Sequence, residues 1–585
     1  MSRKVMRTKV FLVAGAAAAL ALPALAQQAT QPAPAPAPTV IQPAPSPSSF
    51  QPGFGSASDE TAVEELTTLN IPPPAPPVEY PGWARRDPWA VGPLDPASHG
   101  LTGDPWGRAS GVFLSTLMRR MDTPLASRWA HIALRDALLA KVRAPGGVNP
   151  VDWVAERAWL LLRMGEADAA RMLVSGVDTD RFTPKMTQVA VQSALANADP
   201  PALCPIEDQI RKNDGAIRAL VQAMCSSLAG EPESAFAQID DARRHGRIGG
   251  VDLALAQKVV GAAGSGQAAT IEWDPVDHLT AWRFGLATAT GMVPPDRLVR
   301  ESSPQLRAFQ ARAPLLSPQQ RLDSALVATG LGVFSSQSLV DLYSAIYDST
   351  DPSDLPSTDA WQLRQAFVGK DEATKIAAIR KLLGNGRPYM QREAMRAAVA
   401  RAASLIEPNT DLQNDAPELI SAMLAAGYDR QAGRWARACA RMNDANGDRC
   451  WAMLALSAPD ARGVDVGFAR ITSFIGRDKS TGKLRSALLV AGLAGVGRIN
   501  ERGANALNRR YGLGLGRRTN WTNVMDQAGR LHQTATILLL TGTGFQSTDF
   551  DHLPPAHLYH SLVALERSGQ DFTARMIAAE ALSRT

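Results

Sequence analysis

The sequence predicts an all-α protein, an α-solenoid of stacked antiparallel helical hairpins that follows a signal peptide and a disordered proline-rich segment. Three observations indicate this fold class. From Trp106 onward, apolar residues recur at three- and four-residue spacing, as at Leu114, Leu117 and Met121, which is typical of amphipathic helices. Alternating β-branched runs bounded by turn residues, the pattern of strands, do not occur. A glycine turn with helical patterns on both sides recurs four times.

The recurring turn places a glycine five residues before an alanine, with an acidic residue between them. Glycine takes the left-handed conformation that ends a helix. Asp or Glu near the next N-terminus meets the positive end of the helix dipole, and a small alanine lets two helices approach closely. The pairs are Gly165 and Ala170, Gly230 and Ala235, Gly427 and Ala432, and Gly569 and Ala574.

At these four turns the chain resembles the tetratricopeptide repeat family, in which a Gly-x-x-x-x-Ala turn joins the two helices of each unit. Small or apolar residues follow the alanine by about four and seven positions in that family, and Val174, Val177, Ala578 and Ala581 stand there in this chain. The chain departs from the family because no period of about 34 residues runs along it, and the aromatic positions of the first helix are mostly missing. The resemblance implies stacked helical hairpins, as in helical-repeat proteins of the bacterial envelope.

Residues 1–26 predict a cleavable secretory signal. Four basic residues and no acidic residue precede or enter an apolar run, and residues 24–26 (Ala-Leu-Ala) form a small-x-small cleavage site. The apolar run is shorter than the roughly 20 residues that span a bilayer. The mature chain is therefore expected to begin near Gln27, to be periplasmic, and not to span the membrane.

The charge balance follows from this interpretation. The formal net charge of the 585 residues is +5, and removal of the four basic residues of the signal leaves +1 for the mature chain. This small excess gives no reason to expect a nucleic-acid partner.

Composition divides the mature chain into three parts. Residues 27–82 are rich in Pro, Ala, Gln and Ser, and are expected to be a disordered tether that acts as a spacer or docks a partner. Helical-repeat regions follow at 83–265 and 270–585. Proline in a first turn predicts helix starts at Pro184, Pro275, Pro318 and Pro555. The apolar run 487–497 is expected to be a helix buried on all sides.

Four cysteines in an exported chain predict structural disulfides. They form two pairs of near neighbours, Cys204 with Cys225 and Cys439 with Cys450, and the second pair flanks a strong turn signal at residues 443–447. The alternative interpretation is four buried, unpaired thiols that pack as small apolar groups.

One short motif suggests catalysis. Glu301-Ser302 resembles the catalytic Glu-Ser of soluble lytic transglycosylases, exported enzymes that carry a long ring of helices before a lysozyme-like domain. The resemblance implies that Glu301 is a general acid that protonates a glycosidic oxygen. The Gly-x-Met-Gln-type substrate loop of that family is not found downstream of Glu301.

Histidines near the C-terminus are the chief candidates for metal ligands. Asp549, His552, His557 and His560 are residue types that bind metals, but two prolines separate His552 from the other histidines. The favoured interpretation is a capped loop that leads into a helix with polar surface histidines. The sequence predicts no metal and no cofactor.

A basic segment surrounds a Gly-x-Gly-x-Gly turn at residues 512–516. No strand precedes the glycines and no Lys-Ser/Thr follows them, so neither nucleotide-binding fingerprint is met. The segment is a candidate binding site for an anionic partner, such as a lipid headgroup, a wall polymer or an acidic protein face, or else a solvated basic surface. Its residues are Arg498, Arg502, Arg509, Arg510, Arg517 and Arg518.

The sequence therefore favours a non-catalytic periplasmic scaffold or adaptor that binds envelope proteins or a cell-wall polymer. The alternative is a peptidoglycan hydrolase of the lytic-transglycosylase type with Glu301 as its acid. A third hypothesis is an adaptor that grips an anionic surface through the basic segment at residues 498–530.

Overall fold

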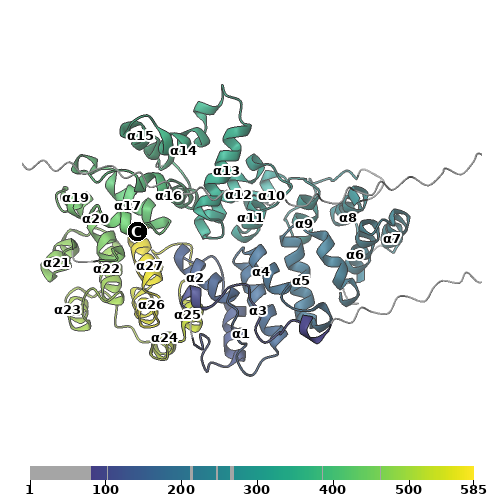
Figure 1. The fold of residues 1–585 in the computed structure, drawn as a ribbon, viewed down its shortest axis with the longest axis horizontal. Coiled ribbons are helices and arrows are strands. Elements are labelled where there is room, and N and C mark those ends of the chain that lie inside the picture. Colours follow the sequence, from purple (N-terminus) through teal and green to yellow (C-terminus); the bar gives the residue numbers. More distant parts are fainter. Residues whose placement is uncertain are drawn as a thin grey trace, which may run out of the picture. The chain divides into compact units, whose positions relative to one another are not determined.

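The computed structural model describes residues 81–585 except 102, 211–214, 246–247, 264–268, 385 and 461–462. The expected signal peptide and almost all of the expected tether lie outside the described residues, which belong to one compact unit, Glu79–Thr585. The described residues form 27 α-helices, several short 3₁₀ helices and two isolated β-bridges (Figure 1). The fold is all-α, as predicted.

The first nine helices come before residue 290, and a long 3₁₀ helix separates α5 from α6. They are α1 (Gly111–Arg120), α2 (Arg128–Leu139), α3 (Pro150–Arg163), α4 (Ala167–Val174), α5 (Pro184–Ala196), η4 (Pro200–Gln209), α6 (Gly215–Leu228), α7 (Pro232–Arg244), α8 (Gly250–Ala263) and α9 (Ala281–Ala289).

The middle of the chain forms nine further helices. They are α10 (Asp296–Glu301), α11 (Pro304–Ala311), α12 (Pro318–Leu331), α13 (Ser336–Ser349), α14 (Asp359–Val368), α15 (Glu372–Leu382), α16 (Tyr389–Ser404), α17 (Ala416–Ala425) and α18 (Asp429–Gly433).

The last nine helices complete the unit. They are α19 (Ala436–Cys439), α20 (Asp444–Ser457), α21 (Phe468–Arg477), α22 (Leu484–Gly495), α23 (Glu501–Tyr511), α24 (Asn520–Arg530), α25 (Thr534–Gly544), α26 (Pro555–Arg567) and α27 (Asp571–Ser583).

Three of the four helix starts predicted from proline are confirmed, at α5, α12 and α26. The start predicted at Pro275 is wrong, because that residue lies in a loop and α9 begins at Ala281. The guanidinium of Arg297 holds this loop by donating to the carbonyl oxygens of Trp273 at 2.6 Å and Val276 at 2.8 Å. These carbonyl oxygens therefore accept from a side chain, whereas in a helix they would accept from backbone amides.

Each of the four glycine turns joins two helices: α3 to α4, α6 to α7, α17 to α18, and α26 to α27. The glycines all have positive φ, between 80° and 87°, and the alanines five residues later are completely buried. At Gly165 a side chain would also clash, since a Cβ atom would lie 2.9 Å from the Cβ of Ala308 in α11. The turns therefore have the backbone geometry that the pattern indicates.

The acidic residues of three of these turns also pair with buried His or Arg side chains. Glu166 is buried, and its carboxylate lies 3.1 Å from Nε2 of His131 in α2. Asp429 of the third turn and Asp571 of the fourth both bind the buried guanidinium of Arg575, at 2.8 and 2.9 Å. Glu166 and Asp429 thus connect one hairpin to another, while Asp571 holds Arg575 from within α27.

Contacts along the chain mostly join helices that are close in sequence, but α2 is different. It packs against α25 and α27 from the other end of the chain, and α1 also touches α25. The colours of Figure 1 show these early and late helices side by side. In a simple stack each hairpin would touch only its neighbours. Helix α2 departs from that arrangement, because it contributes to several interfaces at once.

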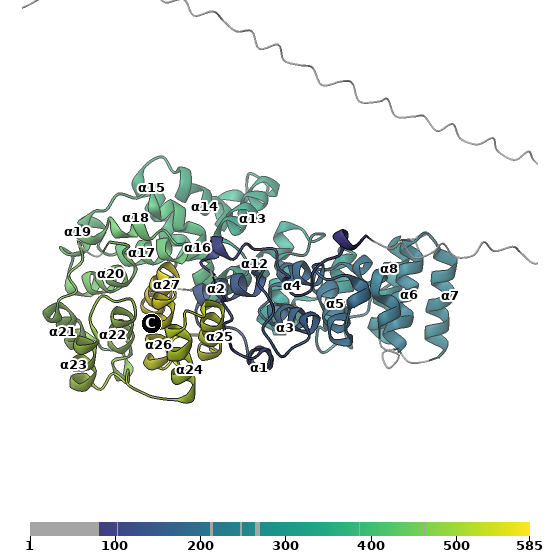
Figure 2. The ribbon, with the colours of Figure 1, turned by 60° about the horizontal axis from the view of Figure 1, so that its bottom comes forward.

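The unit has a large core and a smaller second one. The second core lies between η4 and helices α5 to α9, and is filled by residues such as Leu220, Met224, Leu255 and Val260. In both views α6, α7 and α8 stand together at one end, with α6 between the other two in Figure 2.

The apolar run at 487–497 largely forms α22, which is buried from Ser486 to Leu493 as predicted. Among the described helices, none combines the length and the apolar character needed to cross a membrane.

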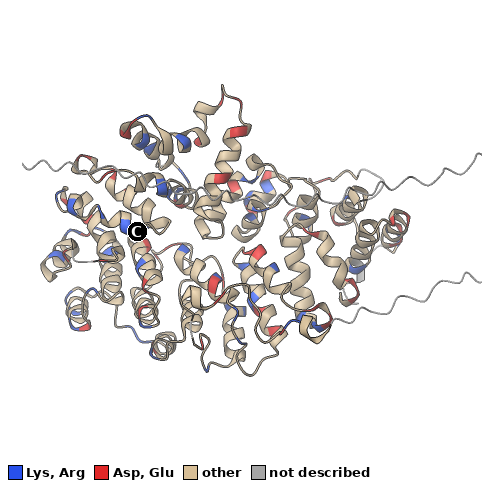
Figure 3. Ribbon diagram, in the orientation of Figure 1, with Lys and Arg blue, Asp and Glu red and all other residues tan. Residues whose placement is uncertain are grey.

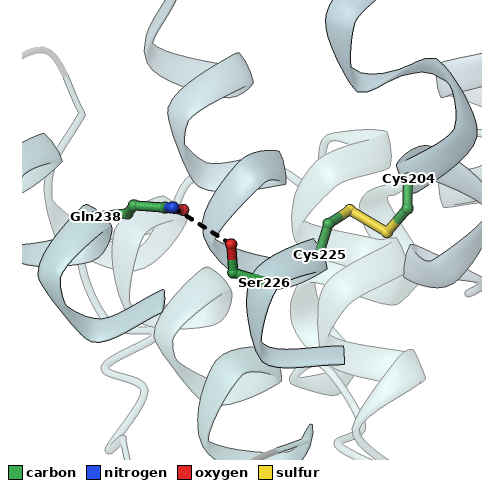
Figure 4. The surroundings of a disulfide bond; sticks show 4 residues. All are labelled: Cys204, Cys225, Ser226 and Gln238. Carbon is green, nitrogen blue, oxygen red and sulfur yellow. Dashed lines mark hydrogen bonds between the residues drawn. A yellow bond between two sulfur atoms is a disulfide. The ribbon is translucent and has the colours of Figure 1, made fainter. Parts of the chain in front are cut away.

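Cys204 and Cys225 form a disulfide that ties η4 to α6 in the second core, with Cα atoms 5.5 Å apart (Figure 4). On the next residue, the Ser226 hydroxyl accepts a hydrogen bond from the Gln238 amide of α7 at 3.3 Å. Closing a loop of this size stabilises the fold by about 3 kcal/mol in the chain-entropy model. The smaller core is thus reinforced covalently.

The predicted disulfide between Cys439 and Cys450 is wrong, since both are buried free thiols of the large core. A hydrogen bond with the Cys439 thiol, and then burial, raise the pKa of Cys450. Here a reduced thiol packs as a small apolar group, so the core is filled without a covalent bond.

Gly285 provides a test of helix packing. A Cβ atom there would lie 2.5 Å from the carbonyl oxygen of Leu195 and 2.9 Å from its Cα, so α9 and α5 would have to separate. We expect Gly285→Ala to destabilise the protein by about 1–3 kcal/mol. The control is Gly476→Ala in α21, where nothing lies within 4 Å and a gain of about 0.4–1 kcal/mol is expected. Denaturant midpoints that fall equally in both variants would contradict this packing.

Thiol counting tests the cysteine assignment. The native protein should react slowly with a thiol reagent, because Cys439 and Cys450 are buried. After unfolding without reductant we expect two titratable thiols per chain, and four after reduction, since only Cys204 and Cys225 are bonded. No thiols before reduction would mean that the second disulfide forms after all.

Candidate binding cleft

Glu580 on α27 places its buried carboxylate at the N-terminus of α2. The carboxylate accepts hydrogen bonds from the Ser127 hydroxyl at 2.5 Å and from the backbone amides of Arg128 and Trp129 at 3.0 and 3.3 Å. Free amides and the positive end of the dipole make a helix N-terminus a favourable place for an anion. The last helix therefore supplies the cap of the second one.

The side chain of Arg128 extends the same junction in the other direction. Its guanidinium donates to the carbonyl oxygen of Thr329 in α12 at 3.0 Å and to that of Ala425 in α17 at 2.6 Å. Burial lowers the pKa of Arg128 to about 10, although the neighbouring Glu580 opposes this shift. The first turn of α2 thus binds α27, α12 and α17.

From Glu580 a row of alternating charges, the charge ladder, runs through the interior. Its first four groups are almost completely buried, and its last is half exposed. The successive pairs are Glu580–Arg584 at 2.6 Å, Arg584–Glu393 at 3.2 Å, Glu393–Arg396 at 2.7 Å, Arg396–Glu418 at 2.9 Å and Glu418–Arg449 at 3.0 Å.

The charge ladder ends in a cleft of about 760 Å³, here the charged cleft, formed by α16, α17, α20, α21, the start of α22, the end of α27 and the residues after it. The letter C in Figure 1 marks the chain end, and Thr585 there is one of the lining residues. The volume falls within the range of small-ligand sites. Its basic residues are Arg392, Arg396, Arg449, Arg477, Lys479, Arg485 and Arg584, and its acidic residues are Glu418, Asp444, Asp448 and Asp478.

The acidic groups of the charged cleft are held ionised. Burial alone would raise the pKa of Glu418, but the guanidinium groups of Arg396 and Arg449 more than offset it, and the pKa is lowered. The pKa of Asp448 is lowered in the same way, with burial outweighed by Arg477 and Arg470. Both carboxylates are therefore hydrogen-bond acceptors at neutral pH.

Several basic groups at the rim retain unused hydrogen-bonding capacity. Lys479 is exposed and makes no ion pair with a described residue. The nearest carboxylate to Arg392 is that of Glu393, at 4.0 Å, and Nε of Arg392 is buried without a hydrogen-bond acceptor among the described residues. Arg485 donates to the backbone oxygen of Thr585. The charged cleft thus has more positive than negative groups available to a ligand.

A neighbouring cavity of about 360 Å³ shares Asp444, Asp448 and Arg477 with the charged cleft. Its wall includes Trp451, and the guanidinium of Arg470 lies 4.0 Å from the centre of that ring. Cavities of about 320 and 260 Å³ lie elsewhere, the first against α3, α5, α9 and α11 and the second between α13 and α14.

The predicted anion-binding arginines do not converge on one point. Arg498 is half-buried and donates to the carbonyl oxygen of Ala458, while Arg518 binds Asp526 at 2.6 Å. The remaining four, Arg502, Arg509, Arg510 and Arg517, are exposed on α23 and the loop after it. Figure 3 shows basic and acidic residues interspersed over the helices.

Glu301 lies at the exposed end of the short helix α10, outside the four cavities described above.

The four candidate metal ligands fall into three separate contacts. His552 pairs with Asp549 at 2.8 Å, and His557 stacks on Trp521 with ring centres 4.4 Å apart. His560 is not the surface residue expected, because it is buried against Asp526 at 2.6 Å. No group of three or more potential ligands that could hold a metal is found in the part of the chain that the structure describes.

Sequence reasoning missed the charged cleft. Its residues lie between positions 392 and 585 on six helices and the segments next to them, so no local motif contains them. One signal was available: Glu393 and Arg396 lie three residues apart on an alanine-rich helix, and Glu580 and Arg584 lie four residues apart at the end of another. Charges three or four residues apart within an apolar pattern indicate buried ion pairs.

The chain matches no model of a known protein family, no curated protein and no solved structure. Its function is therefore inferred from its own residues.

The charge ladder predicts a pH-dependent contribution to stability. Glu418→Gln should lower the free energy of unfolding at pH 7 by about 1–2 kcal/mol, because three charge-assisted hydrogen bonds from two arginines lose their anion. The pKa of Glu418 is lower in the folded protein than its ordinary value of 4.5, so this contribution is complete above pH 4.5 and is lost as the pH falls further. The difference between variant and wild type should shrink in acid.

The matched control is Glu407→Gln. Glu407 also binds an arginine, Arg434, through both carboxylate oxygens, but the pair is exposed, so the cost should stay below about 1 kcal/mol. Equal costs for the two variants at pH 7, or a cost for Glu418→Gln that does not shrink between pH 7 and pH 3, would contradict the role given to Glu418.

Proposed function

We propose that the chain is a non-catalytic scaffold or adaptor of the bacterial periplasm that binds envelope proteins or cell-wall material. The observation that carries this proposal is the charged cleft. Arginines hold Glu418 and Asp448 ionised, and Glu393 holds Arg396 and Arg584 in place, so a ligand is met by a preorganised surface and little ordering cost is incurred on binding. Lowered carboxyl pKa values suit recognition better than proton donation.

The sequence supports the cellular part of the proposal. A signal peptide would export the chain, and the proline-rich segment would separate the folded unit from a surface. We further propose that the hairpins are tetratricopeptide-like repeats of a solenoid. The positive φ of all four turn glycines and the complete burial of the paired alanines support that kinship.

The lytic hydrolase remains the alternative, and it depends on Glu301. A general acid of that class is ordinarily held in an apolar pocket beside a second carboxylate or a bound water. Glu301 is exposed at the end of α10, which favours the scaffold.

The proposal is tested by sedimenting the purified mature chain with isolated cell-wall sacculi, while measuring pelleted protein and released sugar fragments. We expect the protein to pellet with sacculi, or to be crosslinked to an envelope protein in intact cells, without sugar release. Glu301→Gln should change nothing, as should the control Glu272→Gln at an exposed loop position.

Two results would overturn the proposal. Fragment release that Glu301→Gln abolishes and Glu272→Gln preserves would make the protein a hydrolase. Absence of both pelleting and crosslinked partners would remove the scaffold function itself.

A further inference from the structure

We propose that the charged cleft binds an acidic peptide segment of a partner protein, with Asp or Glu side chains spaced along it. This inference rests on the proposed scaffold function and names the chemistry of its partner. It follows from the excess of basic groups, from their arrangement around the charged cleft, and from the acidic groups placed among them.

The basic groups suit carboxylates. A guanidinium offers two parallel N–H donors that match the two oxygens of a carboxylate, and the pair is stronger than a neutral hydrogen bond. Arg449 is half exposed, and Glu418 holds it from the inner side. Arg392 and Lys479 bring further donors to the rim with no close carboxylate of their own, since the nearest to Arg392 is 4.0 Å away.

The position of the basic groups is set by the interior. Arg396 and Arg584 are buried and neutralised by Glu393, which lies within 3.2 Å of both. They support the wall of the charged cleft and are not free for a ligand. The groups left for a partner are therefore those at the rim, separated from one another along several helices.

The acidic groups argue against a dense polyanion. Glu418, Asp444 and Asp448 line the same space, and Asp448 is held ionised. They would repel a polyphosphate or a nucleic-acid backbone, whose charges are closely spaced. A peptide differs because its backbone N–H groups can donate to these carboxylates while its own acidic side chains reach the rim.

The exposed arginines of α23 are less suited to this role. Arg502, Arg509 and Arg510 lie on one helix, and none of them lines a cavity described above. Solvent screens isolated surface charges, and they select partners poorly. The charged cleft combines charge with a concave shape, which favours specific recognition.

The test measures binding of a fluorescent peptide of alternating Glu and Gly residues to the mature chain by anisotropy. We expect Lys479→Glu to weaken binding about tenfold or more, since an attractive contact at the rim becomes repulsive. Lys479 has no ion-pair partner among the described residues, so its replacement should leave folding intact. The matched control is Lys370→Glu, an exposed residue in the turn between α14 and α15, and it should leave the affinity unchanged.

Competing ligands show whether the site prefers an acidic peptide to another anion, and a third variant shows whether the peptide binds the charged cleft or α23. A Gln-Gly peptide should not compete, and tripolyphosphate should compete weakly. If Arg509→Glu weakens binding while Lys479→Glu does not, the peptide binds α23 and the inference is wrong. Stronger competition by tripolyphosphate than by the acidic peptide would also overturn it.

Different results would contradict the acidic-peptide site and the scaffold function. If the Lys479→Glu protein pellets with sacculi, or is crosslinked to envelope partners, as well as the wild type, the scaffold function stands and the acidic-peptide site is refuted. If the wild type binds neither sacculi nor partners, the scaffold function is lost whatever the peptide does.

Discussion

The carboxylate of Glu580 at the N-terminus of α2 is the interaction on which the rest of the structure depends. It brings the last helix against one of the first, and it satisfies amides that would otherwise be buried without acceptors. Hydrogen bonds to a charged group contribute about 1.5–3 kcal/mol each, and an unpaired buried carboxylate costs more than that. Because Arg128 on the same turn reaches α12 and α17, helices far apart in sequence are held at one point.

The charge ladder connects this junction at α2 with the charged cleft at the surface. Arg584, Glu393 and Arg396 each contact two groups of opposite sign, and Glu580 is compensated by Arg584 and by the amides of α2, so no buried charge is left uncompensated in a medium of low dielectric constant. Alternation also fixes side-chain orientation, because a guanidinium that binds two carboxylates cannot rotate freely. The wall of the charged cleft consequently has a geometry that is determined from inside the protein, and this favours it over the exposed arginines of α23 as the proposed binding site.

The two cores are stabilised by different means. The large core buries enough apolar surface to hold Cys439 and Cys450 as reduced thiols, whereas the smaller core between η4 and α9 carries the disulfide. A small core gains more from a cross-link because it has less apolar burial to offset chain entropy. Sequence spacing could not separate the two cysteine pairs, since both lie at short separations beside helices. Pairing depends on the distance between sulfur atoms in the folded chain.

The sequence by itself determined the helices, three of the four proline starts, the four glycine turns and the buried apolar helix α22. These features depend on interactions within a few residues: backbone conformation at glycine and proline, capping side chains, and the period of apolar positions. Folding alone brings Glu580 to α2, pairs Glu166 and Asp429 with side chains of other helices, and gathers residues from 392 to 585 around one cleft. Those partners lie tens to hundreds of positions apart, and no local pattern encodes which distant helix a buried charge will face.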